Sequence, residues 1–499
     1  MKLHSRIEST TLFSLIFVLS LLISIPAGAQ EKNLRAYFSY TTFYSPAEGP
    51  YIETYLSIDG SSVRLAPDDN NQFSGAVQVI LIFKKENVIV NFDKYLLSSP
   101  EITDTSDVQF NFLDQQRYKL DEGTYDFEMQ ISDVNSEQKP FIHSVPVEIT
   151  YNSEEAAVSG IQIVESFKET ENVGKFSKSG YDIIPYPSNF LPENMDRIIF
   201  YCEIYNINKV EDEGEKFLLS YYIEDIDHGK VLNDYVRFKK ENARSVSIVF
   251  SEFNIANLKS GNYNLVVEAR NKENKLLAVN KLFFQRSNPK VKMRVDDLAG
   301  IDISTTFAGN ITSADTMKQL LQYLDPISSE YERYFTASII QSDDLLSMQR
   351  YLYKFWSDRY PSRPREAWQD YLGEVNKVNL AYSTQIEKGY RTDRGRIYLK
   401  YGPPNAISES YSEPGTYPYE IWHYYQLKNG QRNKRFIFYS TDIVTNDFVL
   451  IHSDVAGELK NYRWQQKIYS RVDAGFDIDQ GVKDDTWGGN SKKYFDIPR

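Results

Sequence analysis

The chain has 499 residues, which is too long for one hydrophobic core and indicates about three domains. Hydrophobic residues make up 41% of the chain and charged residues 25%, as in ordinary folded proteins. The formal net charge of −13 argues against nonspecific nucleic-acid binding, which needs a basic surface. The 37 tyrosines favour β strands and contact surfaces.

The amino terminus has the features of an export signal. Lys2 and Arg6 precede the apolar segment 11-TLFSLIFVLSLLISI-25, and the small residues 27-AGA-29 follow at cleavage spacing. We therefore expect removal of residues 1–29 and export to the periplasm or the outer membrane; a retained anchor helix is the alternative. No cysteine follows the apolar segment, so we expect no lipid anchor there, and no later segment is apolar enough to span a membrane.

The single cysteine, Cys202, excludes an internal disulfide, which suits a bacterial envelope better than a eukaryotic secretory route. Cys202 lies in 198-IIFYCEIY-205, where it shares one strand face with Phe200 and Ile204. This pattern favours a buried, inert thiol over a nucleophile.

Residues 31–290 have a β pattern of branched and aromatic runs separated by polar turns. Within this region the frame Leu-x-x-Gly-x-Tyr occurs twice, ending at Tyr125 and Tyr263. In a β-sandwich this frame is typical of a tyrosine corner, whose hydroxyl group bonds back to the main chain. The repeat predicts two tandem Ig-like β-sandwich domains, at residues 30–155 and 156–290.

After residue 290 the pattern predicts an α+β domain over residues 291–474, with helices first and an antiparallel sheet afterwards. A polar, irregular tail is expected over residues 475–499. The predicted helices lie at 314–324, at 343–358 and from Arg365 onward. The predicted strands lie at 396–402, 419–427, 435–440 and 446–453.

The stretch 389-GYRTDRGRIYLKYGPPN-405 is the most regular in the chain. It resembles the frame Gly-Trp-x-Thr-Asp, Arg-Gly-Arg-Ile-Tyr, an apolar residue and Tyr-Gly-Pro-Pro of the GWxTD-domain family, exported envelope proteins found mainly in Bacteroidota. Tyr390 replaces the tryptophan that names the family, and Asn405 stands where aspartate is frequent. The segments 179–190 and 419–424 also resemble the family. The resemblance implies export but no defined activity.

We interpret this stretch as a structural motif. Ile397 and Leu399 lie two residues apart, which predicts a strand over 396–402 that Gly402-Pro403-Pro404 ends. Thr392 and Asp393 can accept main-chain N–H bonds in the preceding turn.

Asp393 beside Arg394 and Arg396 suits an ion pair better than a general acid. A ligand or partner site remains the alternative. The residues assigned to the motif are Gly389, Tyr390, Thr392, Asp393, Arg394, Gly395, Arg396, Tyr401, Gly402, Pro403, Pro404 and Trp422.

Three functions are compatible with these patterns. The first is a noncatalytic envelope protein that binds a protein partner through its tyrosines. The second is a glycan- or peptide-acting hydrolase with Glu420 and Asp393 as its acid-base pair. The third is a glycan-binding protein, which requires exposed aromatic residues on one sheet face. The tyrosines proposed for that role are Tyr201, Tyr205, Tyr221 and Tyr222.

We expect no cofactor and no metal site. Beyond the signal, histidines occur singly at His143, His228, His423 and His452, without metal-ligand spacing, although His423 and His452 lie on strands of one predicted sheet. The acidic runs 225–229 and 477–485 do not match an EF-hand loop and are interpreted as solvated segments.

Overall fold

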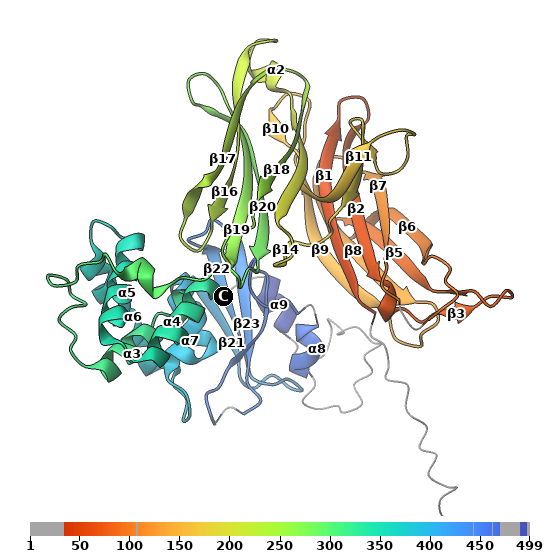
Figure 1. The fold of residues 1–499 in the computed structure, drawn as a ribbon. Helices are drawn as coiled ribbons and strands as arrows, with labels where there is room; N and C mark the ends of the chain where they lie inside the picture. Colours follow the sequence, from red (N-terminus) through yellow and green to blue (C-terminus); the bar gives the residue numbers. More distant parts are fainter. Residues whose placement is uncertain (1–33, 106–107, 443, 462, 470–489, 497–499) are drawn as a thin grey trace, which may run out of the picture.

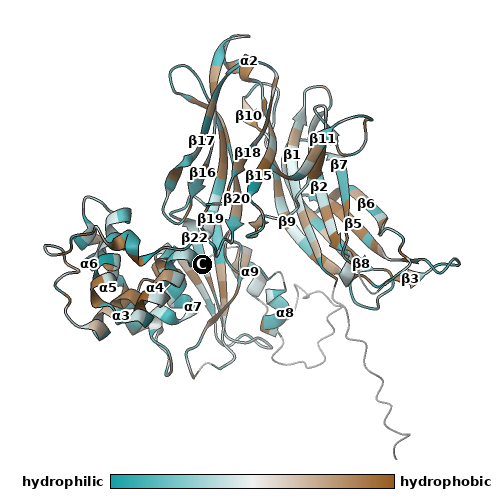
Figure 2. Ribbon diagram, viewed as in Figure 1, coloured by the Kyte–Doolittle hydropathy of each residue, from teal (hydrophilic) through white to brown (hydrophobic). Residues whose placement is uncertain are grey.

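The computed structural model describes residues 34–105, 108–442, 444–461, 463–469 and 490–496. The predicted export signal and the acidic run 477–485 therefore lie outside the described residues. Strands dominate up to residue 286, and most of the helices follow (Figure 1). This agrees with the prediction of a largely β chain with helices after residue 290. Apolar and polar residues alternate along many of the strands (Figure 2).

Seven of the first nine strands form the N-terminal sheet pair, which encloses one apolar core, whereas β3 and β4 pair with each other in a separate two-stranded sheet. The strands are β1 (Ala36–Ser45), β2 (Gly49–Asp59), β3 (Ala66–Pro67), β4 (Phe73–Ser74), β5 (Ala76–Lys85), β6 (Val88–Ser98), β7 (Asn111–Lys119), β8 (Gly123–Asp133) and β9 (Phe141–Ile149). One sheet has the order β1-β2-β7 and the other β6-β5-β8-β9. Strand β1 therefore lies at an edge, with β2 as its ladder partner among the described residues.

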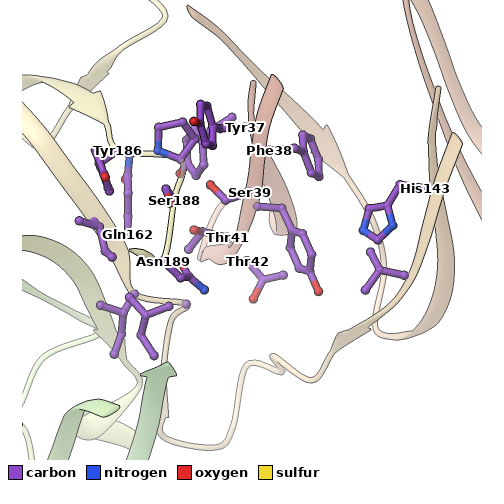
Figure 3. A pocket seen from close by; sticks show the side chains of 18 of the residues that line it. Tyr37, Phe38, Ser39, Thr41, Thr42, His143, Gln162, Tyr186, Ser188 and Asn189 are labelled. Atoms are coloured by element: carbon purple, nitrogen blue, oxygen red, sulfur yellow. The ribbon is translucent and has the colours of Figure 1, made fainter. Parts of the chain in front are cut away.

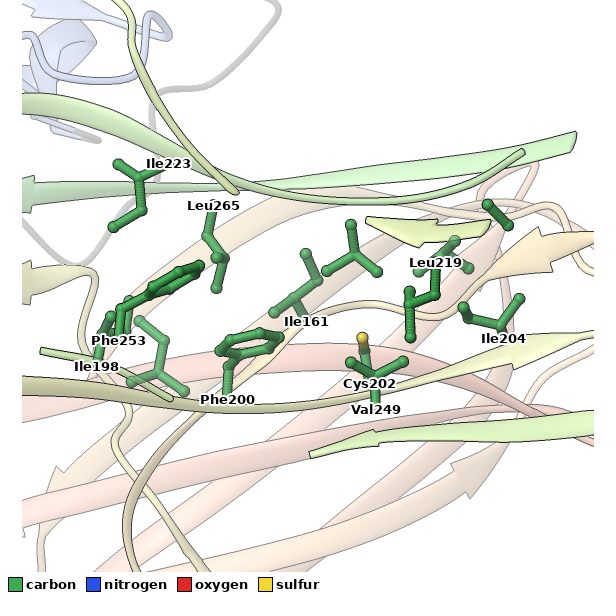
Figure 4. Packing of buried hydrophobic residues seen from close by; sticks show 14 of the residues in the cluster. Ile161, Ile198, Phe200, Cys202, Ile204, Leu219, Ile223, Val249, Phe253 and Leu265 are labelled. Atoms are coloured by element: carbon green, nitrogen blue, oxygen red, sulfur yellow. The ribbon is translucent and has the colours of Figure 1, made fainter. Parts of the chain in front are cut away.

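The next eleven strands form the central sheet pair. They are β10 (Ala157–Val158), β11 (Gln162–Glu169), β12 (Ser177–Lys178), β13 (Tyr181–Pro185), β14 (Phe190–Leu191), β15 (Arg197–Tyr205), β16 (Lys216–Asp225), β17 (Lys230–Asn242), β18 (Val246–Asn254), β19 (Gly261–Arg270) and β20 (Leu276–Arg286). Cys202 lies in their shared core beside Phe200 and Ile204, as predicted (Figure 4). Burial raises the pKa of this thiol far above its ordinary value, which agrees with an inert cysteine.

The repeated Leu-x-x-Gly-x-Tyr frames form two tyrosine corners. Tyr125 donates its hydroxyl hydrogen bond to the Asp121 carbonyl over 2.7 Å, and Tyr263 donates to the Lys259 carbonyl over 3.0 Å. Both tyrosines are buried, one in the core of each sheet pair. The sequence prediction of this feature is confirmed. The predicted domain boundaries stay predictions.

The C-terminal unit packs helices on both faces of a four-stranded antiparallel sheet, as Figure 1 shows. The sheet, ordered β21-β22-β23-β24, consists of β21 (Ala406–Ser410), β22 (Tyr419–Gln426), β23 (Arg432–Tyr439) and β24 (Val449–Ser453). The helices are α3 (Ala314–Gln322), α4 (Glu330–Ser342), α5 (Leu345–Arg359), α6 (Pro364–Tyr382), α7 (Asp393–Tyr401), α8 (Trp464–Tyr469) and α9 (Ser491–Asp496). Helix α7 lies against one sheet face and α8 against the other.

The predicted strand over 396–402 is wrong, because these residues belong to helix α7 and its C-cap. Ile397 packs against the sheet, whereas Leu399 packs among the other helices. A helix that is buried on two sides carries apolar residues on both sides. Its apolar residues can therefore lie two positions apart, as they do in a strand. The Thr392 side chain accepts a hydrogen bond from the Gly395 N–H and caps the helix, a signal that the sequence prediction did not use.

Three other helices of the C-terminal unit, α4, α8 and α9, were also missed. Helix α4 begins with a capping box, in which Ser329 and Glu332 bond reciprocally to each other's backbone N–H groups. Part of the tail expected to be irregular forms α9, where Phe495 packs against Trp464. The remainder of that tail lies outside the described residues.

A buried ion pair joins the N-terminal and central sheet pairs. Lys178 of β12 lies 2.7 Å from the Glu53 carboxylate of β2, and Arg117 of β7 lies 2.7 Å from the same carboxylate. The Lys178 ammonium group also lies 3.5 Å from the ring centre of Phe43. Although burial opposes it, the charge of Lys178, followed by that of Arg117, lowers the pKa of Glu53. Buried charge therefore fixes this junction.

A second junction connects the β16–β17 turn to helices α4 and α5. His228 lies 2.7 Å from Asp225 in the same turn and 3.5 Å from Glu332 of α4. Arg359 of α5 lies 2.8 Å from Glu332. Burial alone would lower the pKa of His228, but its bonds to Asp225 and Glu332 raise it to about 9. The turn thus contributes a second cation beside the ion pair of Arg359 and Glu332.

We expect this second junction to weaken at alkaline pH. The folded pKa of His228 lies above its ordinary value of 6.5, so the stabilisation is fully present below pH 6.5 and is lost as the pH rises through about 9. The loss is at most about 3 kcal/mol. Calorimetric Tm values at pH 6 and pH 9.5 measure it, and the His228→Gln variant serves as the control. An identical pH dependence in both proteins would contradict the assignment.

Candidate functional site

The motif of residues 389–405 is built around the close packing of α6, the turn at 389–391 and α7. A methyl group added at Gly395 would lie 1.8 Å from the Gly389 carbonyl oxygen, and one added at Gly389 would lie 2.2 Å from the Val378 carbonyl oxygen. Tyr390 is buried and packs edge-to-face on Tyr323, with ring centres 4.9 Å apart. The tyrosine thus has a packing role at the position where the family has tryptophan.

Arg394 and Glu420 form a buried ion pair at the centre of the motif. Arg394 Nη1 lies 2.7 Å from Glu420 Oε1, and the two residues are 5% and 3% exposed. Glu420 also accepts hydrogen bonds from Trp422 Nε1 at 2.9 Å and from the Tyr411 hydroxyl at 3.1 Å. The second terminal nitrogen of Arg394 donates to the backbone and side-chain oxygens of Asn446. The pair therefore ties α7 to β22 and to the loop before β24.

A second cluster surrounds Glu458. Its carboxylate lies 2.9 Å from Arg396 and 2.8 Å from Lys400, and it accepts a hydrogen bond from the Tyr401 hydroxyl at 2.8 Å. Burial opposes ionisation, but the charges of Lys400 and Arg396 lower the pKa of Glu458. Arg396 and Lys400 also line a polar cavity of about 230 Å³ between α7 and the central sheet pair, together with Asp227.

The ends of α7 contribute the remaining motif residues. Asp393 Oδ2 accepts a 2.8 Å hydrogen bond from the Leu450 N–H of β24, and Asp393 Oδ1 lies 3.7 Å from Arg396. Gly402 has a φ of +89° at the C-cap, and its carbonyl accepts a bond from the Tyr424 hydroxyl. Pro403 and Pro404 follow and prevent the helix from continuing.

Glu420 and Asp393, the acid-base pair of the hydrolase alternative, both have contacts inside the fold. Glu420 is buried beneath three donors, and Asp393 holds the start of α7 against β24. A general acid or base must reach a substrate proton, directly or through one water molecule. Glu420 has no such access in this arrangement.

A larger cleft lies between the N-terminal and central sheet pairs (Figure 3). Its volume is about 760 Å³, within the range of ligand and peptide sites. Seven consecutive residues of β1, Ala36–Thr42, line one wall. The opposite wall includes Gln162, Asn189 and Asn280, and Lys460 of the C-terminal unit also lines the cleft. The sequence prediction missed this cleft because two separate sheet pairs form it.

The remaining predicted residues do not assemble into a chemical site. His423 lies on β22 and His452 on β24, so strand β23 separates them. Burial lowers the pKa of His452 to about 4. Within the described ranges, no three His, Cys, Asp or Glu side chains are placed to hold a metal ion. None of the described helices combines the length and the apolar character that a membrane span requires.

The fold and the motif define a largely β-sheet protein whose final helix-and-sheet unit is held together by buried ion pairs. Residues 296–481 match the family model of the GWxTD domain. The chain is therefore a GWxTD domain-containing protein, as the motif resemblance indicated. No curated protein matches the chain.

Three solved structures share part of the fold at low sequence identity. Fibronectin(III)-like modules of CbhA from Clostridium thermocellum share 8% identity, over 49% of this chain and 89% of theirs, with a TM-score of 0.15. A glycosyl hydrolase family 2 member from Bacteroides cellulosilyticus shares 10% identity, over 47% of this chain and 26% of its own, with a TM-score of 0.19. Salmonella alpha-2-macroglobulin mutant Y1175G shares 14% identity, over 51% of this chain and 16% of its own, with a TM-score of 0.16.

Proposed function

We propose that this protein is an exported, noncatalytic scaffold of the cell envelope that binds a protein partner. In this proposal it is located in the periplasm or at the outer membrane. The N-terminal and central sheet pairs are two tandem Ig-like domains, and the C-terminal unit is an α+β domain that orients them.

The pairing of the buried charged groups in and around the motif supports this proposal. The buried Arg394–Glu420 pair and the carboxylate of Glu458 are satisfied by contacts inside the fold. A substrate would have to displace these contacts before it could use either carboxylate. Stabilising the fold is the role that this arrangement supports best.

The tyrosines proposed for glycan binding do not form an exposed face. Tyr201 and Tyr205 are buried, and their hydroxyl groups donate to Glu203. Tyr221 packs against the core of the central sheet pair, and Tyr222 is half-buried. This distribution favours the protein-partner proposal over the glycan-binding alternative.

Edge strand β6 offers a contact surface for a partner. Val90, Phe92 and Leu96 lie on the same face of this strand, and they are 50%, 53% and 60% exposed. A long edge strand with exposed apolar residues is a template for association unless a partner covers it. A partner that packs against β6 would therefore bury the apolar surface of this strand.

The test is affinity capture from an envelope extract with the mature protein as bait. We expect a stoichiometric partner, and we expect Phe92→Lys to reduce its recovery at least fivefold. Phe238→Lys is the matched control, because Phe238 is 74% exposed on β17 of the central sheet pair. Equal loss in both variants, or no stoichiometric partner, would contradict the proposal, as would hydrolysis of envelope glycan that Asp393→Asn abolishes without unfolding the protein.

A further inference from the structure

The cleft between the two sheet pairs exposes the backbone edge of strand β1, because consecutive residues from Ala36 to Thr42 line it. A wall of side chains from one strand face would contribute alternate residues, whereas a strand edge contributes all of them. At 3.4 Å per residue, this wall offers about 20 Å of strand edge.

The hydrogen-bond register shows which backbone groups point into the cleft. Asp59 of β2 donates its N–H to the Arg35 carbonyl, so the odd-numbered residues of β1 bond toward β2. The even-numbered residues bond in the opposite direction. Accordingly, the Thr42 carbonyl accepts a bond from the Gly160 N–H of the central sheet pair, and the Tyr44 N–H donates to the Tyr205 hydroxyl.

The same alternation turns the N–H and C=O groups of Ala36 and Phe38 away from β2. These two residues lie toward the start of the strand, beyond the part that Gly160 and Tyr205 cover. An extended peptide can form ladder bonds with such groups, as in β-strand addition. Among the residues that the structure describes, the geometry is therefore that of a strand edge open on one side.

The chemistry of the cleft indicates the kind of strand that fits. Among the described residues, its charged lining side chains are Lys281 and Lys460 and include no Asp or Glu, although the whole chain is acidic. Lys281 is paired with Glu224 over 2.8 Å. Gln162 is 3% exposed at the cleft wall, and its Oε1 has no hydrogen-bond partner among the residues that the structure describes. The cleft thus favours a carboxylate and offers a further acceptor.

We propose that the outward edge of β1 binds an extended strand of the partner protein, which forms ladder bonds with Ala36 and Phe38 and directs a carboxylate toward Lys460. This inference rests on the proposed function, which supplies the partner, and it identifies where that partner docks. The apolar surface of β6 lies on the other sheet of the same pair and contributes a separate contact.

The edge is tested with two kinds of change. Ala36→Pro removes an outward N–H at the first strand position, where proline is tolerated, and it removes no bond to β2. In a complementary measurement on the unaltered protein, the peptide ligand selected from the library described below is N-methylated at alternate residues. This change blocks strand pairing but keeps every side chain of the peptide. Lys460→Glu reverses the cleft charge, and Lys428→Glu, an exposed change in the β22–β23 hairpin, is its control.

The probe is a phage-displayed library of random decapeptides. We expect selection of peptides that alternate apolar residues and contain Asp or Glu. By fluorescence anisotropy, Ala36→Pro and peptide N-methylation should each weaken binding at least tenfold. Lys460→Glu should weaken it at least threefold, and Lys428→Glu should leave it unchanged.

Several results would overturn the edge assignment. The first is a library in which the unaltered protein enriches no peptide more strongly than the Ala36→Pro variant does. The second is a set of selected peptides that bind equally well after N-methylation. The third is binding of maltoheptaose, and not of peptide, in the cleft. A dimer in light scattering that Ala36→Pro dissociates would assign the edge to a second copy instead. A captured partner that binds Ala36→Pro unchanged would refute the edge but leave the proposed function intact, whereas absence of any partner would refute the function itself.

Discussion

The Arg394→Met variant is expected to lose about 3–5 kcal/mol of stability in the C-terminal unit. Methionine retains much of the side-chain length but removes the charge, so Glu420 stays buried with only Tyr411 and Trp422 as donors. An unpaired buried carboxylate is far more costly than a missing surface charge. Adding Glu420→Gln should recover part of the loss, because the remaining group is then neutral.

Tryptophan fluorescence measures this loss selectively. All five tryptophans lie after residue 350, and the four described ones, Trp356, Trp368, Trp422 and Trp464, belong to the C-terminal unit, so their emission during urea unfolding reports on that unit. Arg391→Met is the matched control, because Arg391 is exposed and bonds to Tyr390 and Gln322 at the surface. The control should change stability by less than about 1 kcal/mol. Equal effects of the two substitutions would show that the buried ion pair has no special role.

Gly395→Ala is expected to prevent the C-terminal unit from folding, or to destabilise it by about 3 kcal/mol or more. The added methyl group would meet the Gly389 carbonyl at 1.8 Å and a Val378 methyl group at 2.7 Å. The carbonyl belongs to the backbone of the turn at 389–391, so relief requires α7 to move away from that turn and from α6. That movement would also separate Arg394 from Glu420.

Gly373→Ala provides the opposite result within the same helix pair. Gly373 lies inside α6, and a methyl group there would meet no atom within 4 Å. Because alanine favours the helix, we expect stabilisation of up to about 1 kcal/mol. Urea unfolding followed by tryptophan fluorescence measures both glycine variants. A tolerated Gly395→Ala would contradict the close approach of the two helices.

Local patterns predicted the elements that a single periodicity defines. The tyrosine corners at Tyr125 and Tyr263 and the buried face around Cys202 follow from short frames that have one physical meaning. The strand predicted over 396–402 was wrong because α7 is buried on two sides, so its apolar spacing had two interpretations. The Thr392 cap would have decided between them.

The candidate site was only partly predictable from the sequence. The motif residues Arg394 and Trp422 do meet the carboxylate of Glu420. Asn446, which bonds to Arg394, and Glu458, which bonds to Arg396, carry no sequence signal. The β1 cleft depends on how two sheet pairs are placed relative to each other, which local periodicity does not encode.

The Lys178–Glu53 contact has a consequence for how the molecule can be divided. Each sheet pair contributes one of the two opposite charges, and both are almost completely shielded from water. If either half were produced by itself, its half of the contact would face solvent beside apolar surface that normally meets the other half. The two sheet pairs must therefore fold together, and their packing fixes the width of the cleft between them.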